Sequence, residues 1–250
     1  MARAALRGRL NWQLAEVVEL IEETPRVRSI VFDVPDWPSH RPGQHVDVRL
    51  TAEDGYQAQR SYSIASVPEE GRVVLTVEVL PDGEVSPYLV EELRPGDTIE
   101  LRGPIGGYFV WDPGLGGPLF LVAGGSGIVT LMSMLRHRTA AESRVPARLV
   151  YSSRTLEDVI FREELEQLIA RSDGVEVFHT LTRARPNDWE GFTRRVDGAM
   201  LAETAWAPAS MPLTFVCGPT SFVETVANAL VLLGHEAKSI KTERFGPTGG

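Results

Sequence analysis

The stretch PLFLVAGGSGIVTLMSMLRHR, residues 118–138, decides the fold of the second half of this chain. An apolar strand, PLFLVA, runs into Gly124-Gly125-Ser126-Gly127, and an apolar helix follows. Glycines at a strand-to-helix turn let the backbone come close to a diphosphate at the helix start, where N–H groups are unpaired. The stretch therefore predicts the first strand, loop and helix of a nucleotide-binding domain. A plain glycine-rich connection is the alternative.

Strands and helices alternate through the rest of the second half. The predicted strands are FLVAG, RLVYSS, VEVFHTL, LTFVCG and AKSIKT. The predicted helices between them are TLMSMLRHR, FREELEQLIA, GAMLAETAW and SFVETVANALVLL. Near-continuous apolar strands with amphipathic connections indicate a parallel sheet covered on both faces, which is a doubly wound α/β domain.

Residues 12–102 have the pattern of an all-β domain instead. The predicted strands are WQLAEVVEL, VRSIVFDV, QHVDVRL, QRSYSIAS, RVVLTVEVL and DTIELRG, with turn residues between most of them. They predict a small antiparallel six-stranded β-barrel. Inside it, Ser86-Pro87 before YLVEEL predicts one helix, with a cap residue followed by proline at the first helical position.

The turn-rich stretch WDPGLGGPL, residues 111–119, separates the two patterns. We therefore expect an α+β protein of two domains, residues 1–112 and 113–250.

Composition narrows the possible partners. With 43% hydrophobic and 24% charged residues, the chain has the composition of a soluble globular protein. The net charge of −9 argues against nucleic acid, which needs a basic face. No apolar run approaches the roughly 18 residues of a membrane span, and Glu16 and Glu19 interrupt the apolar stretch that a secretory signal would need. We expect a cytoplasmic protein that binds neither nucleic acid nor membrane.

Cysteine and histidine usage argues against metal centres. Cys217 is the single cysteine, so an internal disulfide is ruled out, and a resident iron–sulfur cluster would normally take four thiolates. The five histidines have no ligand spacing, so we expect no metal site.

The run Arg60-Ser61-Tyr62-Ser63 has the groups that hold a flavin. Arg60 and Tyr62 lie two apart on a predicted strand and so share a face. An arginine fork suits a phosphate, and a tyrosine plane suits an isoalloxazine ring. Strand periodicity puts Ser63 on the opposite face. A surface Arg–Tyr pair is the alternative.

Four further segments follow in order: GEVSPYLVEEL, GPIGGYF, LVAGGSGIVTLMSML and FVCGPTSF. Together with RSYS they resemble the ferredoxin–NADP reductase superfamily of flavin-dependent electron-transfer enzymes, over nearly the whole chain. The resemblance implies that Arg60 meets the flavin diphosphate and that Tyr62 stacks on the ring. It also implies that the Ser63 hydroxyl approaches the ring nitrogen that takes the hydride.

The resemblance implies further flavin contacts. Glu84-Val85-Ser86 would hold the FAD diphosphate, and a helix N-terminus offers unpaired N–H groups for it. Capping alone is the alternative for Ser86. We expect FAD, with FMN less favoured. The residues that continue the flavin strand are further candidates for cofactor contacts: Ile64, Ala65 and Ser66.

The second cofactor would be NADPH. Ser152 and Arg154 follow the second strand of the nucleotide domain, where an arginine accommodates a 2′-phosphate. NADPH is therefore favoured over NADH, which remains possible. The alternative is that Arg154 pairs with Glu157 or Asp158. Arg183 and Arg185 could supplement the phosphate site. The family usually has proline where this chain has Thr130, and we expect little effect because the loop glycines are kept.

Three segments supply the candidates around the nicotinamide. In the resembling family, the cysteine of Cys217-Gly218-Pro219 lies beside the reacting nicotinamide, and the glycine and proline let it approach. A buried packing cysteine is the alternative, and we do not expect a nucleophile. Glu243 and Phe245 resemble an acidic and aromatic pair near the chain end, where the aromatic covers the flavin until nicotinamide displaces it. Five residues follow Phe245, so a linker remnant is the alternative. The expected catalytic residues are Ser63, Cys217 and Glu243.

The chain is therefore expected to be an NAD(P)H-dependent flavoprotein reductase that passes electrons from NADPH through FAD to a separate carrier, with ferredoxin as first choice. A haem or molybdenum enzyme, or a free flavin or ferric chelate, are alternative acceptors. A non-catalytic flavin redox-sensing module is disfavoured because both nucleotide segments are present. A subunit resembling that of dihydroorotate dehydrogenase is disfavoured because its usual cysteine cluster is absent.

Overall fold

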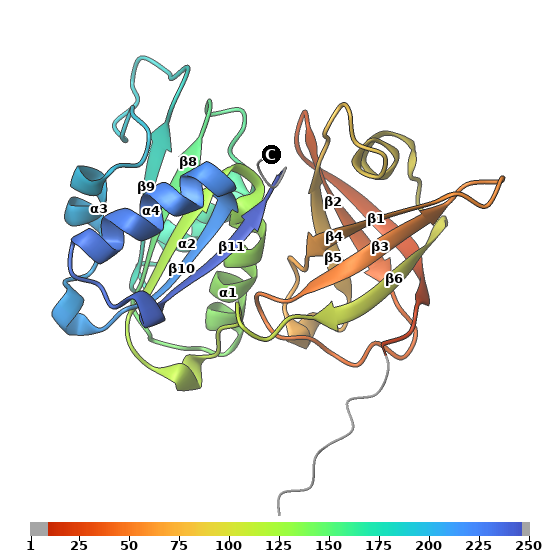
Figure 1. The fold of residues 1–250 in the computed structure, drawn as a ribbon, viewed down its shortest axis with the longest axis horizontal. Helices are drawn as coiled ribbons and strands as arrows, with labels where there is room; N and C mark the ends of the chain where they lie inside the picture. The colour runs from red at the N-terminus through yellow and green to blue at the C-terminus, as the bar shows by residue number, and fades with distance from the viewer. Residues whose placement is uncertain (1–9, 247–250) are drawn as a thin grey trace, which may run out of the picture.

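A computed structural model describes residues 10–246 and shows two lobes side by side (Figure 1). The first lobe is built of strands. They are β1 (Gln13–Thr24), β2 (Val27–Asp33), β3 (His45–Thr51), β4 (Gln57–Ser63), β5 (Val73–Glu78) and β6 (Thr98–Ile105). Two short helical turns, η1 (Pro68–Glu70) and η2 (Tyr88–Glu92), lie between them.

The six strands form one antiparallel sheet in the order β4-β3-β6-β1-β2-β5. Directly after the edge strand β4, Ile64 forms a bridge with Leu75 of the other edge strand, β5, and so curls the sheet into a barrel. Side chains at alternate positions, such as Val73, Leu75 and Val77 on β5, fill its core. The predicted six-stranded barrel is confirmed.

Local contacts changed two details of that prediction. β4 ends at Ser63 rather than Ser66, because the Ser66 hydroxyl donates to the Arg72 carbonyl and accepts the Val74 N–H, and so forms its own turn. The predicted capping by Ser86 is wrong. Its Oγ accepts the Leu80 N–H at 3.0 Å, and within residues 10–246 no side chain caps η2.

The second lobe alternates strands and helices. Its strands are β7 (Leu119–Gly124), β8 (Ala147–Ser153), β9 (Val175–Leu181), β10 (Leu213–Pro219) and β11 (Ile240–Phe245). Its helices are α1 (Ile128–Ala140), α2 (Arg162–Ala170), α3 (Gly198–Thr204) and α4 (Thr220–Leu232). Short turns are η3 (Pro113–Leu115), η4 (Gly125–Gly127), η5 (Pro208–Ser210) and η6 (Ala237–Ser239). The strands are parallel in the order β11-β10-β7-β8-β9.

Both faces of this sheet are covered. On β7, Leu121 and Ala123 pack into the core with α1 and α2, whereas Phe120 and Val122 pack with α3 and α4. Strands that are apolar on both faces require such double cover, which confirms the doubly wound domain. The last strand differs in its bounds: Ala237–Ser239 is a helical turn, and β11 runs from Ile240 to Phe245 instead of 237–242.

The segment between the lobes packs against both. Phe109 and Trp111 belong to the core of the second lobe. Gly43 of the barrel has φ +94, and a Cβ there would lie 1.8 Å from the Phe109 carbonyl oxygen and 2.9 Å from Met134 of α1. The division at residues 112 and 113 falls between β6 and β7 and stays a prediction. Over residues 10–246, no helix combines the length and apolar character that a membrane crossing requires.

Candidate active site

The flavin candidates Arg60, Tyr62 and Ser63 lie on β4, an edge strand of the barrel sheet. In the register of β3 and β4, Arg60 pairs with Val48 and Tyr62 with Val46, and both valines face the barrel core. Arg60 and Tyr62 therefore share a face, as their spacing predicts. Ser63 pairs with His45 and lies on the other face of the strand.

Glu84 brings the segment after β5 against β4. Its Oε2 lies 2.7 Å from Nη2 of Arg60, and the Tyr56 hydroxyl donates to its Oε1 at 2.6 Å. These contacts, first from Tyr56 and then from Arg60, lower the pKa of the Glu84 carboxyl. Both side chains of the Arg60–Glu84 pair are about half exposed (54% and 47%). An exposed pair of this kind is weakly held, so a phosphate can replace Glu84 as the partner of Arg60.

The next two residues, Val85 and Ser86, offer fewer polar groups to a ligand than Glu84 does. The Val85 side chain is fully buried in the barrel core, so only its backbone is available to a ligand. Ser86 is buried, and its oxygen accepts the Leu80 N–H. Its own O–H has no acceptor among residues 10–246 and is able to donate to a phosphate.

Tyr62 is partly buried against the barrel core. Burial raises the pKa of its phenol to about 12, and nearby Arg60 offsets part of that effect. The ring is therefore neutral at physiological pH. A neutral aromatic plane at the barrel opening fits a flat heteroaromatic ligand.

The three residues after β4 are buried, and their side chains make contacts within the protein. Ile64, Ala65 and Ser66 are at most 1% exposed. The Ala65 carbonyl accepts from Arg136, and the Ser66 hydroxyl is used within its own turn. We therefore propose no side-chain contact between these residues and a cofactor.

The glycine loop lies at the point where the strand order of the parallel sheet reverses. From β7 the chain builds β8 and β9 on one side and then returns to place β10 on the other. Ligands of doubly wound folds bind in the crevice at such a switch point. Here the loop 124–127 meets the end of β10 at 217–219.

Most of the glycines at this point are required by packing. A Cβ on Gly127 would lie 2.2 Å from the Cys217 carbonyl oxygen. Cβ atoms on Gly124 and Gly218 would lie 3.0 and 2.8 Å from the Phe222 ring. Gly125 differs: it has φ +55, and apart from its chain neighbours no atom of the described chain lies within 4 Å of its Cβ position. Packing accounts for Gly124, Gly127 and Gly218, and the approach of these glycines to a ligand stays a prediction. Gly125 and the partly exposed Ser126 form the open part of the loop.

Cys217 and Glu243 are neighbours in the parallel register of β10 and β11. Cys217 is 2% exposed, and burial, with a smaller effect of the Glu243 charge, raises the pKa of its thiol. The thiol therefore stays protonated and is no nucleophile. Burial also raises the pKa of Glu243 to about 7. Its Oε2 is buried and has no hydrogen-bond partner within residues 10–246. An unpaired buried oxygen of this kind fits a ligand with a donor group, such as a carboxamide.

Phe245 pairs with Pro219 at the end of β11 and is 36% exposed. The preceding Arg244 is fixed by Glu224 at 2.6 Å. The aromatic side chain thus comes from the same strand ends as Cys217 and Glu243.

The phosphate candidates also come together. The Arg183 N–H donates to the Arg154 carbonyl at 2.9 Å, which continues the pairing of β8 and β9 beyond the sheet. Both arginines, and Arg185, are exposed, and within residues 10–246 neither Arg154 nor Arg183 has a carboxylate oxygen within 4.0 Å. Asp158 accepts from Thr155 instead of pairing with Arg154. Ser152 is partly buried at the end of β8, in register with Gly124.

Two basic residues near the site were not found from the sequence. Lys241, two positions before Glu243, donates from Nζ to the Val110 carbonyl at 3.3 Å and lies 5.1 Å from the Phe215 ring centre. Arg136 reaches from α1 to the Ala65 carbonyl. Neither belongs to a recognisable motif, so only the folded chain shows what each contacts.

Comparison with known proteins agrees with this arrangement. Residues 15–110 match the model of the oxidoreductase FAD-binding domain, and residues 121–228 match that of the oxidoreductase NAD-binding domain. Ferredoxin–NADP reductase B of Sorangium cellulosum is 34% identical over 241 residues, which cover 92% of this chain and 96% of the relative. The chain belongs to the ferredoxin–NADP reductase superfamily. As a member, it is a flavin-dependent oxidoreductase with an FAD-binding and an NAD-binding domain.

Other superfamily members are similar over different lengths. The glycine betaine monooxygenase reductase subunit of Chromohalobacter salexigens is 34% identical over 236 residues, which cover 92% of this chain. The chain spans only 63% of that relative's length. The flavohem-like FAD/NAD binding domain of nitric oxide dioxygenase from Vibrio cholerae O1 biovar El Tor has the same fold, with a TM-score of 0.84. It is 24% identical, and the match covers 94% of this chain and 99% of that one.

Proposed function

We propose that this protein takes electrons from NADPH and passes them, by way of FAD, to a separate carrier protein such as a ferredoxin. The observation that carries the proposal is the meeting of Gly127, Cys217 and Glu243 at the switch point of the parallel sheet. A glycine loop packed against a strand end, beside an unpaired buried carboxyl oxygen, is the arrangement expected of a nicotinamide site in this superfamily.

The barrel supplies the groups for FAD. Arg60 would exchange Glu84 for the diphosphate, Ser86 would donate its O–H to it, and Tyr62 would lie against the ring. Bound there, FAD would supply the redox chemistry that couples a two-electron hydride donor to a one-electron acceptor. Ser63 lies on the other face of β4 from Arg60 and Tyr62. Its proposed contact with the ring edge would therefore be made at the end of β4, from the other face of the strand.

Arg154 and Arg183 support NADPH over NADH. Two adjacent exposed guanidinium groups, with no carboxylate near them in residues 10–246, are available to a 2′-phosphate. Hydrogen bonds between a guanidinium and a phosphate are charge-assisted and stronger than neutral ones. The open part of the loop, Gly125 and Ser126, would accept the dinucleotide diphosphate next to the start of α1.

Glu243 and Cys217 would set the position of the nicotinamide. The Glu243 carboxyl, with a pKa of about 7, exists in both protonation states near neutral pH and is able to hold a proton at Oε2 or accept a carboxamide donor. Cys217 would contribute through packing and not through charge, because its thiol is protonated and its carbonyl packs against Gly127. The protein's contribution is then orientation of the reacting rings.

Relatives support two classes of acceptor. The ferredoxin–NADP reductase from Sorangium cellulosum matches over nearly all of both chains, which favours a ferredoxin. The glycine betaine monooxygenase reductase subunit has equal identity over a shorter part of its length, which makes an oxygenase component the second candidate. A cytoplasmic location stays a prediction from the sequence.

Anaerobic addition of NADPH to the FAD-loaded protein tests the proposal. We expect the visible flavin absorbance to bleach, more readily with NADPH than with NADH, and to return on adding ferricyanide. Candidate carriers, ferredoxins first and oxygenase components second, then replace ferricyanide. Protein that takes up no FAD, or FAD that stays oxidised with both nucleotides, would contradict the proposal. The second outcome would favour a non-catalytic flavin-binding module.

A further inference from the structure

Helix α1 connects the nucleotide loop to the barrel through three polar side chains. Ser133 Oγ accepts the Gly43 N–H at 3.2 Å, Arg136 Nη1 donates to the Ala65 carbonyl at 2.7 Å, and His137 Nδ1 lies 3.0 Å from Glu69 Oε1. The helix begins directly after Gly127, and Ala65 lies two residues after Ser63. One rigid element therefore runs from the nucleotide loop to the flavin segment 60–66.

Arg136 is the most constrained of the three. Its Nε and Nη2 bind both oxygens of Glu164 on α2, at 2.9 and 2.6 Å. Its guanidinium lies 4.6 Å from the ring centre of Phe161, and its side chain is 20% exposed. A planar guanidinium fixed on one edge by a carboxylate holds its remaining N–H groups in set directions. The Ala65 carbonyl is thus hydrogen-bonded to the second lobe by the Arg136 guanidinium, whose orientation is fixed by Glu164.

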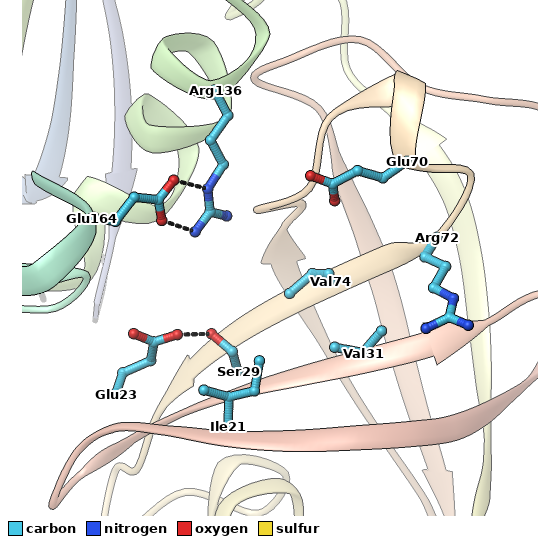
Figure 2. A pocket seen from close by; sticks show the side chains of 9 residues that line it. All are labelled: Ile21, Glu23, Ser29, Val31, Glu70, Arg72, Val74, Arg136 and Glu164. Atoms are coloured by element: carbon cyan, nitrogen blue, oxygen red, sulfur yellow. Dashed lines mark hydrogen bonds and ion pairs between the residues drawn. The ribbon is translucent and has the colours of Figure 1, made fainter. Parts of the chain in front are cut away.

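The interface beside Arg136 is hollow. Figure 2 shows Arg136 and Glu164 on one side of a pocket and barrel side chains on the other. The pocket has a volume of about 600 Å³. It is lined by Ile21, Glu23, Ser29, Val31, Glu70, Arg72, Val74, Arg136 and Glu164. Tight side-chain packing normally transmits rigidity between elements. Around the pocket the lobes do pack, since Val27, Ala65 and Val74 of the barrel belong to or pack against the core of the second lobe. Arg136 adds a hydrogen bond to the backbone beside the flavin strand.

We propose that Arg136 is a positioning residue that sets the alignment of the flavin segment with the nucleotide loop and so controls the rate of hydride transfer. The proposal rests on the proposed function. In the transfer, the C–H bond of the reduced nicotinamide breaks, the hydride with its two electrons passes to the flavin, and NADP⁺ remains. Misplacement of reacting groups by about 1 Å costs on the order of a hundredfold in rate. A loosened contact at Ala65, two residues from Ser63, is close enough to cause such a displacement.

The kinetic test compares Arg136→Ala, Arg136→Lys and Glu164→Gln with the FAD-loaded wild-type protein. Arg162→Ala is the matched control, since Arg162 forms an exposed ion pair with Glu166 at 3.0 Å on α2, outside the pocket lining. Stopped-flow reduction at increasing NADPH gives the limiting rate and the half-saturating concentration. Reoxidation of the reduced protein by ferricyanide serves as an internal reference, because it needs no nucleotide.

We expect Arg136→Ala to lower the limiting rate of flavin reduction by about tenfold to a hundredfold. The half-saturating NADPH concentration, the FAD content and the ferricyanide rate should stay at wild-type values. Arg136→Lys should recover part of the rate, because an ammonium can still reach the Ala65 carbonyl but loses the paired contact with Glu164. Glu164→Gln should fall between Arg136→Lys and wild type, and Arg162→Ala should behave as wild type.

Hydrogen exchange on the FAD-loaded proteins gives a second readout that needs no nucleotide. Segments 64–72 and 128–140 should exchange faster in Arg136→Ala than in Arg162→Ala. Unchanged exchange, a wild-type reduction rate, or an equal loss of both half-reactions together with FAD would each overturn the positioning role. If the wild-type protein is reduced by neither NADPH nor NADH, the proposed function fails, and the exchange data still decide whether Arg136 aligns the lobes.

Discussion

The barrel opening and the switch point use opposite kinds of chemistry. At the barrel, Arg60 and Glu84 are charged, about half exposed and paired with each other. At the switch point, Cys217 is buried and uncharged, and Glu243 has a buried oxygen without a partner. An exposed ion pair contributes little to stability, whereas buried groups and close backbone contacts contribute much more. Substitutions at the barrel opening should therefore alter ligand binding, and substitutions at the switch point should alter the fold as well.

The largest effect is expected at Gly127. Its Cβ position lies 2.2 Å from the Cys217 carbonyl oxygen, so Gly127→Ala forces two backbone segments apart. We expect a loss of about 1–3 kcal/mol or more in the free energy of unfolding, the usual cost of overpacking. Urea unfolding measures it. Gly198→Ala is the control, since apart from its chain neighbours and the nearby backbone of α3 no atom of residues 10–246 lies within 4 Å of that Cβ position. Equal unfolding midpoints for Gly127→Ala and wild type would remove the contrast between the two regions.

Arg60→Ala should weaken FAD binding while leaving stability almost unchanged. The loss of hydrogen bonds to a charged group costs about 1.5–3 kcal/mol, or roughly ten- to a hundredfold in the dissociation constant. Equilibrium dialysis against FAD measures the change. Arg49→Ala is the control, because Arg49 pairs with Glu100 and lies on the opposite face from Arg60 in the register of β3 and β4. A purified Arg60→Ala protein that stays fully loaded and active would show that the phosphate assignment is wrong.

Arg154→Ala should reduce the preference for NADPH. Removing one guanidinium from an exposed phosphate site should weaken NADPH binding about tenfold, equivalent to about 1.4 kcal/mol. NADH has no 2′-phosphate, so its binding is the internal control and should not change. Arg183→Ala should act in the same direction, because its backbone is hydrogen-bonded to that of Arg154. Equal losses for both nucleotides would place the 2′-phosphate elsewhere.

Glu243→Gln should change the pH dependence of stability. Burial raises the pKa of Glu243 from the ordinary 4.5 to about 7, so the folded protein binds an extra proton between these values. The resulting stability is fully present below about pH 4.5 and is lost as pH rises through 7. Glu243→Gln should lose less stability than wild type between pH 5 and pH 8, measured as urea midpoints. Glu23 and Glu70, whose pKa values burial also raises, occur in both proteins and cancel in the difference. Parallel pH curves for the two proteins would contradict the shifted pKa.

Elements that depend on local pattern were predictable from the sequence. Alternation on β5 and continuous apolar runs on β7 gave the barrel and the doubly wound sheet, because side-chain period and burial are linked within one strand. The positions of Arg60, Tyr62 and Gly125 follow from short motifs. Contacts between distant segments were not predictable in this way. Glu84 meets Tyr56 and Arg60, and Ser86 bonds Leu80 instead of capping its helix, because the chain after β5 folds back against the open barrel edge.

The amino-acid sequence alone determined the two-domain architecture, the superfamily and the segments from which a flavin and a nucleotide site would be built, since these depend on periodicity and on motifs a few residues long. Only the tertiary structure decided which of those residues have polar groups that remain available to a ligand. It buried Ile64 and Val85 in the barrel core and filled the space beside Gly124 and Gly127 with Phe222 and Cys217. It also left Glu243 without a partner and placed Arg136 against Ala65. The reason is physical: desolvation and alignment depend on what surrounds a side chain in space, and most of those neighbours come from distant parts of the chain.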